Sequence, residues 1–73
     1  MENNINKLFG EKIVELRRQN GFTQEELSFR CGIHRAYMGT IERGEKSVTL
    51  DTVAKIAAGL CVEVKELFDF KQQ

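Results

Sequence analysis

The 73-residue sequence lacks proline and tryptophan, and it contains only two cysteines and one histidine. It has no apolar run near the ~18 residues that a membrane-spanning helix needs. Its N-terminus has no basic region followed by an apolar stretch, so nothing resembles a secretory signal. We therefore expect a cytoplasmic protein with no membrane partner.

Candidate residues for metal binding and catalysis are equally scarce. Cys31 and Cys61 stand alone, without a Cys-x-x-Cys pair, and His34 has no second histidine with which to share a metal. The favoured interpretation makes both thiols small buried side chains, while a disulfide stays open. No nucleophile–base pair or carboxylate pair can be assembled. We expect no metal, no cofactor, no small-molecule ligand and no enzymatic activity.

An excess of either charge is also missing, because eleven basic side chains balance eleven acidic ones. A neutral chain has no overall attraction for nucleic acid or for membranes. The charges are nevertheless unevenly placed, since residues 17–46 carry six basic and four acidic side chains. Neutrality is thus an average over a modestly basic middle and slightly acidic flanks. If the partner is DNA, non-specific binding should be weak.

At this length residues 1–73 should form one domain, with a core over about residues 5–69 and a frayed tail at 70–73. A domain of this size buries roughly 60% of its unfolded surface, which leaves little room for a catalytic cleft. Apolar residues recur at spacings of three and four between glycines, which predicts helices and no strand. We expect an all-α, compact five-helix domain with helices near residues 4–20, 24–31, 34–43, 50–60 and 64–68.

The apolar stripes of these helices define the expected core. The main core-facing positions are Ile5, Phe9, Ile13, Leu16, Met38, Ile41, Leu50, Val53, Ile56, Ala57 and Leu60. Thr23 with Glu26 three residues later predicts a capping box at the start of the second helix. Gly32 then tolerates the positive φ of a tight turn. Two short helices joined by such a turn are typical of a helix-turn-helix.

Several short segments, in order and at matching spacing, resemble the XRE family of Cro- and phage-repressor-like helix-turn-helix proteins. The resemblance covers about residues 8–68 and implies a lambda-repressor-like DNA-binding fold. It rests on Leu16-Arg17, Gly21-Phe22-Thr23-Gln24-Glu25-Glu26-Leu27, Gly32-Ile33, Ile41-Glu42-Arg43-Gly44 and Glu66-Leu67-Phe68. Residues 34–44 also resemble the small controller proteins of restriction-modification systems.

The resemblance implies a DNA-binding face on the second and third helices and the loop that follows. Its residues would be Thr23, Gln24, His34, Arg35, Ala36, Tyr37, Gly39, Thr40, Arg43, Lys46 and Ser47. Arg35 and Thr40 would read bases, and Gln24 would hold the DNA backbone at the positive end of its helix. Phosphate contacts would come from Tyr37, Arg43, Lys46 and Ser47. Thr23 would serve chiefly as a helix cap.

The same resemblance implies a structural ion pair between Arg17 and Glu42, which would join the first helix to the third. Several positions depart from the family pattern, and Glu63 at the cap of the last helix is one of them. His34 replaces the usual hydroxyl cap, so we expect a less well capped third helix. Cys61 replaces a helix-ending glycine. Gly39 lies inside the third helix, where it either allows close approach to DNA or reflects drift.

These expectations describe a sequence-specific transcriptional regulator that binds a palindromic operator as a homodimer. Residues 34–43 would form the recognition helix in the major groove. The dimer interface is expected on the last helices and the tail, at Val62, Val64, Leu67, Phe68 and Phe70. The alternative is an antitoxin or protein-interaction module, in which the same fold binds DNA only secondarily. A flat salt dependence of weak DNA binding would favour that alternative.

Overall fold

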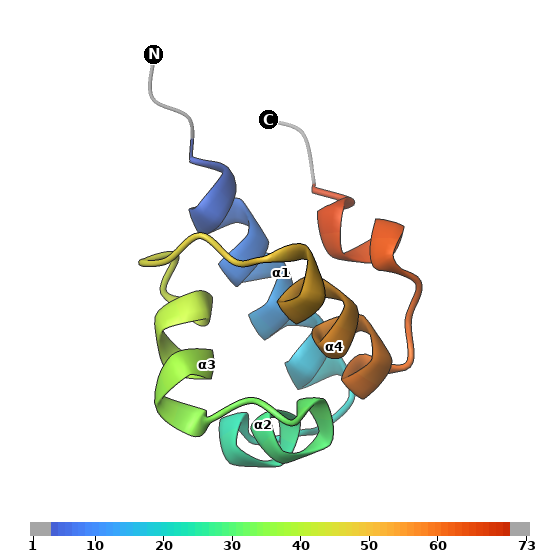
Figure 1. Cartoon of the computed structure of the whole chain (residues 1–73). Coiled ribbons are helices and arrows are strands. Elements are labelled where there is room, and N and C mark those ends of the chain that lie inside the picture. Colours follow the sequence, from blue (N-terminus) through green and yellow to red (C-terminus); the bar gives the residue numbers. More distant parts are fainter. Residues whose placement is uncertain (1–3, 71–73) are drawn as a thin grey trace.

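The computed structural model describes residues 4–70, which form four α-helices and one 3₁₀ helix (Figure 1). Within these residues there is no strand, which confirms the all-helical prediction. No helix of this part of the chain is long and apolar enough to cross a membrane. Apart from Phe70, the predicted frayed tail lies outside the described residues. The elements are α1 (Ile5–Gln19), α2 (Gln24–Cys31), α3 (Arg35–Glu42), α4 (Leu50–Leu60) and η1 (Val64–Phe68).

The prediction of five α-helices is wrong for the last element, η1, which is a 3₁₀ helix. The Glu66 backbone N–H donates to the carbonyl of Glu63 at 2.9 Å, and that of Asp69 donates to Glu66 at 3.4 Å. Both bonds span three residues rather than four. Five residues are too few to offset the cost of nucleating an α-helix, so the tighter form is used instead.

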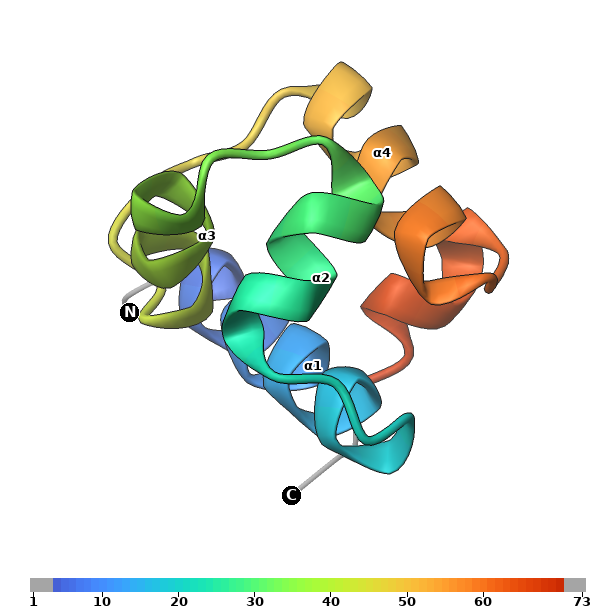
Figure 2. The ribbon, with the colours of Figure 1, turned by 90° about the horizontal axis from the view of Figure 1, so that it is seen from below.

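The helices surround one core, to which every element contributes. α1 packs against α3 and η1, while α2 packs against α3 and α4. Figures 1 and 2 show α3 on one side of the molecule and η1 on the other, with α1, α2 and α4 between them. The largest fully buried side chains are Ile13, Leu27, Met38, Ile41, Ile56 and Leu67.

Two residues of the predicted stripes lie outside this core. Leu50 is 86% exposed and Ile5 is 40% exposed. Each is the first residue of its helix, one turn before the part that packs against neighbours. The periodicity of the stripes therefore identified the correct helix faces but extended them one turn too far.

Two glycines bring helices together more closely than any other residue would allow. A Cβ on Gly10 would collide with the carbonyl oxygen of Ile41 and lie 2.6 Å from that of Glu42. A Cβ on Gly59 would collide with the sulfur of Cys31. Gly10 thus lets α1 touch the C-terminal end of α3, and Gly59 lets α4 touch the end of α2.

The two cysteines are free and differ in environment. Cys31 is buried, and this burial raises the pKa of its thiol to about 11, against a smaller opposing effect of the nearby Arg30 charge. Cys61 is exposed, so the interpretation that both thiols are buried is wrong for this residue. Its position at the end of α4, beyond the last buried turn, keeps it out of the core.

Cys61 ends α4 in the left-handed conformation, with φ of 60° and ψ of 42°. A side chain in this region costs roughly 1–2 kcal/mol, a cost that glycine avoids. We expect Cys61→Gly to raise the free energy of unfolding by about 1 kcal/mol, equivalent to roughly 4–8 °C in Tm for a domain of this size. Thermal denaturation followed by circular dichroism measures this shift. Cys61→Ala removes the sulfur but keeps the Cβ, so equal stability of the two variants would contradict the prediction.

Candidate nucleic-acid interface

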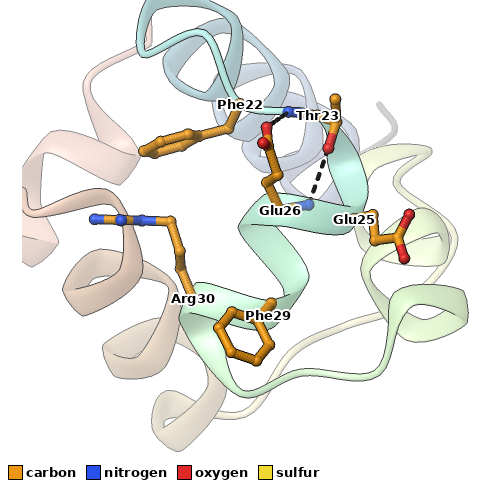
Figure 3. Close-up of a pocket in the computed structure, with 6 residues that line it drawn as sticks. All are labelled: Phe22, Thr23, Glu25, Glu26, Phe29 and Arg30. Atoms are coloured by element: carbon orange, nitrogen blue, oxygen red, sulfur yellow. Dashed lines mark hydrogen bonds between the residues drawn. The ribbon is translucent and has the colours of Figure 1, made fainter.

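The N-terminus of α2 is fixed by the capping box expected from the sequence. The backbone N–H of Glu26 donates to Oγ1 of Thr23 at 3.0 Å, and that of Thr23 donates to Oε1 of Glu26 at 2.8 Å (Figure 3). These bonds satisfy amides that a helix start otherwise leaves without partners. Gly32, with φ of 68°, ends the same helix and begins the turn toward α3.

The side chain of Arg30 connects α2 to the end of α4. Arg30 donates from Nε to the carbonyl of Gly59 at 2.8 Å, and its guanidinium lies 4.5 Å from the centroid of the Phe22 ring. Figure 3 shows Arg30 and Phe22 facing each other beside a hollow that Thr23, Glu25, Glu26 and Phe29 also line. Thr23 therefore lines this hollow, whereas most of the other predicted DNA-binding residues line a different one.

α3 is capped by His34, the residue that was expected to cap this helix less well than a hydroxyl would. Nδ1 of His34 accepts a hydrogen bond from the backbone N–H of Ala36 at 3.2 Å. An imidazole nitrogen without a proton is an acceptor, so it replaces the hydroxyl oxygen that more often serves as a cap. The remaining ring nitrogen is then the one that carries the proton and can donate outward.

Most of the predicted DNA-binding residues lie around one shallow hollow, which we call the recognition hollow. His34, Arg35 and Ala36 are exposed at the N-terminal end of α3. Arg35 is thus accessible from the solvent at the start of the helix. The recognition hollow is lined by Gln24, His34, Arg35, Ala36, Gly39, Thr40 and Arg43.

Tyr37, Lys46 and Ser47 do not line this hollow, whereas Thr40 does. Tyr37 is half-buried and packs against the core, which gives it a structural role as well. The hydroxyl of Thr40 donates to the carbonyl of Tyr37 at 2.7 Å, so its single donor is occupied within α3. Lys46 and Ser47 are exposed in the loop after α3, where the Ser47 hydroxyl accepts from Nδ2 of Asn6 at 3.1 Å.

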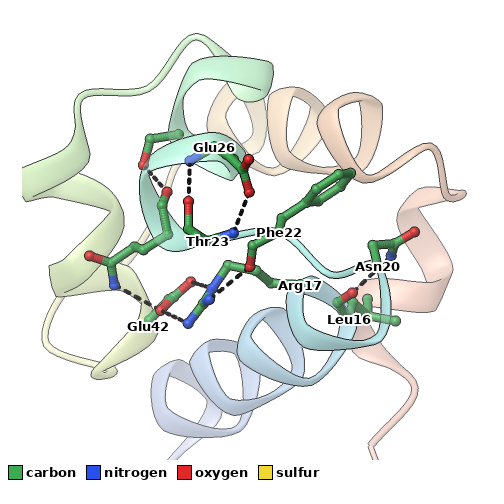
Figure 4. A network of polar contacts seen from close by, with 9 residues as sticks. Leu16, Arg17, Asn20, Phe22, Thr23, Glu26 and Glu42 are labelled. Carbon is green, nitrogen blue, oxygen red and sulfur yellow. Dashed lines mark hydrogen bonds and ion pairs between the residues drawn. The ribbon is translucent and has the colours of Figure 1, made fainter.

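Arg17 and Glu42 form a bidentate ion pair between α1 and the last residue of α3 (Figure 4). The Nε–Oε2 distance is 2.8 Å and the Nη2–Oε1 distance is 3.2 Å. Arg17 also donates from Nη1 to the carbonyl of Phe22 at 3.1 Å. The two side chains are only 13% and 6% exposed. The pair therefore holds α1, the start of α2 and the end of α3 in one arrangement.

Gln24 takes part in this network, a role that the sequence did not reveal. Its Nε2 donates to Oε1 of Glu42 at 2.9 Å. An amide NH₂ has two donors, so the second remains for another acceptor. Because Gln24 also lines the recognition hollow, the network connects the buried ion pair to the surface where DNA binding is expected.

Arg43 is joined to Glu45, a residue that the sequence did not single out. Nε of Arg43 lies 2.9 Å from Oε2 of Glu45, and Nη2 lies 3.2 Å from Oε1. The side chains are 59% and 53% exposed. Their hydrogen bonds and opposite charges lower the pKa of Glu45 and raise that of Arg43. A cation expected to meet phosphate thus already has an anionic partner.

The predicted dimer surface is partly apolar and exposed. Val64 is 47% and Phe68 41% exposed, and the Phe68 ring lies 5.2 Å from that of Phe9 and 6.1 Å from that of Phe70. Val62 and Phe70 are half-buried.

The prediction that Leu67 belongs to the dimer interface is wrong. Leu67 is fully buried in the core, so its side chain has no surface to offer a partner. Leu8, on the helix α1 that packs against η1, is also 39% exposed.

Within residues 4–70, no group of three or more histidine, cysteine, aspartate or glutamate side chains lies close enough together to hold a metal ion. The polar side chains that do converge are those of the recognition hollow and of the ion pairs beside it. Their chemistry is hydrogen bonding by guanidinium, amide, hydroxyl and imidazole groups.

Comparison with known proteins agrees with this architecture. Control protein C.BamHI of Bacillus amyloliquefaciens is 45% identical over 71 residues, covering 96% of this chain and 88% of that protein. The restriction-modification controller protein C.AhdI of Aeromonas hydrophila has a similar structure, with a TM-score of 0.84 and 41% identity over 86% of this chain and 96% of that chain. C.Esp1396I, solved bound to a 25 base pair operator site, gives a TM-score of 0.83 at 28% identity, over 93% of this chain and 90% of that one.

The helix-turn-helix family HTH_3 matches residues 13–67, which span α2, α3 and α4 completely. The capping box, the Gly32 turn and the buried face of α3 all fall within this range. The chain therefore belongs to the HTH_3 family of XRE-type helix-turn-helix transcription regulators.

Proposed function

We propose that the protein is a sequence-specific transcriptional regulator that binds a palindromic operator as a homodimer and inserts α3 into the major groove. The observation that carries the proposal is the recognition hollow, because Gln24 of α2 lines it together with Arg35 and Thr40 of one helix, α3. That helix is fixed from behind by Met38, Ile41 and the Glu42 network. The function requires no catalytic step and no cofactor.

The comparisons support this proposal in two ways. C.Esp1396I, whose fold is similar along most of its length, was solved on an operator site. C.BamHI and C.AhdI are named as control proteins, the latter of a restriction-modification system. We infer that this chain controls genes of such a system, and a restriction or modification gene beside its own would support the inference.

The side chains of the recognition hollow divide into two kinds of contact. Arginine bonds bidentately to O6 and N7 of guanine, which makes Arg35 the principal base reader. Thr40 offers its methyl group to thymine, since its hydroxyl proton is held by Tyr37. Phosphate contacts come from Gln24, at the N-terminus of α2, and from the loop residues Lys46 and Ser47. These contacts set the register of the complex.

A dimer is required because one helix reads only a few base pairs. Two recognition helices about 34 Å apart would meet successive major grooves of a palindromic site. The exposed apolar side chains Val64 and Phe68 of η1 form the candidate interface. Sedimentation should show a dimer, and a strict monomer both free and on DNA would overturn this part of the proposal.

Selection of bound duplexes from a random DNA pool tests the function directly. We expect a palindromic consensus with half-sites one helical turn apart. Enrichment of a single, non-repeated half-site would exclude the symmetric dimer. Absence of any enrichment, together with weak binding that hardly changes with salt, would favour a protein-interaction module instead.

Arg35→Ala separates base reading from phosphate holding. We expect it to relax selectivity at one position of each half-site, at a cost of about 1–3 kcal/mol per contact for the preferred base. Lys46→Ala is the matched control, because loss of a phosphate contact should weaken binding to all sequences about equally. Competition binding with single-base operator variants measures both effects. An unchanged base preference in Arg35→Ala would show that Arg35 does not read bases.

A further inference from the structure

The ion pair between Arg43 and Glu45 lies at the edge of the recognition hollow, which Arg43 helps to line. The guanidinium of Arg43 extends back over α3, since a Cβ placed on Gly39 would lie 3.2 Å from its Nη1. Glu45 binds the opposite edge of this guanidinium through Nε and Nη2. The absence of a side chain at Gly39 is what leaves room for this arrangement.

We propose that Glu45 acts as an intramolecular substitute for a DNA phosphate, so that a phosphate reaches the Nε and Nη2 edge of Arg43 only by displacing this carboxylate. The inference rests on the proposed DNA-binding function. A carboxylate and a phosphate present the same kind of paired oxygen acceptors to a guanidinium, and both bind it bidentately. Two adjacent oxygens of Glu45 already occupy two of its donors.

The exchange has a consequence for selectivity. Releasing Glu45 leaves a free carboxylate beside the polyanionic backbone, which opposes binding. The exchange therefore succeeds where the rest of the interface brings a phosphate close to Arg43, as on a fully docked operator. On loosely bound DNA the Glu45 carboxylate stays bound to the Arg43 guanidinium, and non-specific binding remains weak. This local pairing adds to the effect of a chain with no net positive charge.

Glu45→Gln tests the proposal, with affinity for random-sequence duplex DNA measured over a range of salt concentrations. We expect affinity to rise about three- to five-fold for each protomer on DNA, in line with the small strength of an exposed ion pair. The slope of log affinity against log salt should steepen by up to about 0.9 per protomer, because one more phosphate is neutralised. An unchanged affinity and slope would overturn the proposal, as would a loss of affinity.

Two controls separate masking of Arg43 from a simple change in charge. Glu15→Gln removes one negative charge from another ion pair, in which Lys12 lies 3.6 Å from Glu15 on α1. It should change DNA affinity much less than Glu45→Gln does. An equal effect would show that the change in net charge, rather than release of Arg43, raises the affinity. In an Arg43→Ala background, Glu45→Gln should lose most of its effect.

Failure of this inference can be told apart from failure of the proposed function. If the wild-type protein selects no DNA sequence, the proposed function fails. If the wild-type protein selects a sequence and Glu45→Gln behaves as wild type, only this inference fails.

Discussion

Replacing Arg17 by methionine is expected to bring the domain close to unfolding at room temperature. The substitution leaves the Glu42 carboxylate, 6% exposed, without the guanidinium that now faces both of its oxygens. Breaking a buried pair in this way costs about 3–5 kcal/mol. A chain of this length has roughly 4–11 kcal/mol of total stability, so the loss takes a large part of it. Urea denaturation followed by circular dichroism measures the difference.

Two further variants make this prediction specific. Arg18→Met changes the adjacent arginine, which is exposed, and should alter stability by less than about 0.5 kcal/mol. Arg17→Met combined with Glu42→Met removes both charges and should recover much of the loss, because an apolar pair often replaces a buried ion pair without cost. A double variant as unstable as the single one would show that the loss came from packing rather than from the unpaired carboxylate.

Gly10→Ala is the second substitution with a large expected effect on stability. We expect it to destabilise the protein, whereas replacing a helical glycine by alanine usually stabilises it. In an exposed helix this substitution stabilises by about 1 kcal/mol. Here the new methyl group would collide with the carbonyl of Ile41 and crowd that of Glu42, and a backbone cannot yield as a flexible side chain does. We expect a loss of about 3 kcal/mol, the upper part of the range for overpacking. Thermal denaturation gives the change in stability.

Gly39→Ala is the matched control for this substitution. Its Cβ would meet the end of the Arg43 side chain at 3.2 Å, and that end can move. Stability should therefore rise rather than fall. If Gly10→Ala also stabilised the protein, the close contact between α1 and α3 would be refuted.

The helix positions could be predicted because their signals are local. Thr23 and Glu26 lie three residues apart in the sequence, and Gly32 acts through its own φ angle. The dependence of Gly10 and Gly59 on neighbouring helices could not be predicted in this way. A glycine inside a helix has the same local pattern whether it faces solvent or the backbone of a residue 31 positions away, as Gly10 faces Ile41.

The candidate site was predicted in a different way, from resemblance to a family rather than from local signals. Arg17, Glu42 and the residues of α3 were identified through resemblance, and the structure places them on the same network or around the same hollow. Glu45 escaped notice because a glutamate two residues from an arginine is common on any surface. Leu67 was misassigned because an α-helical period does not apply to a 3₁₀ element, so the sequence pattern could not distinguish it from the exposed Phe68.

In the proposed complex, α3 uses different side chains for packing against the domain and for contact with DNA. Met38, Ile41 and Glu42 fix α3 to the rest of the domain, while Arg35, Ala36 and Thr40 line the hollow. Substitutions in the second group leave the first intact. If the proposed function holds, sequence divergence can therefore change which DNA is bound without a new fold. The α2–α3 unit could not be transplanted alone, because α1 supplies Arg17.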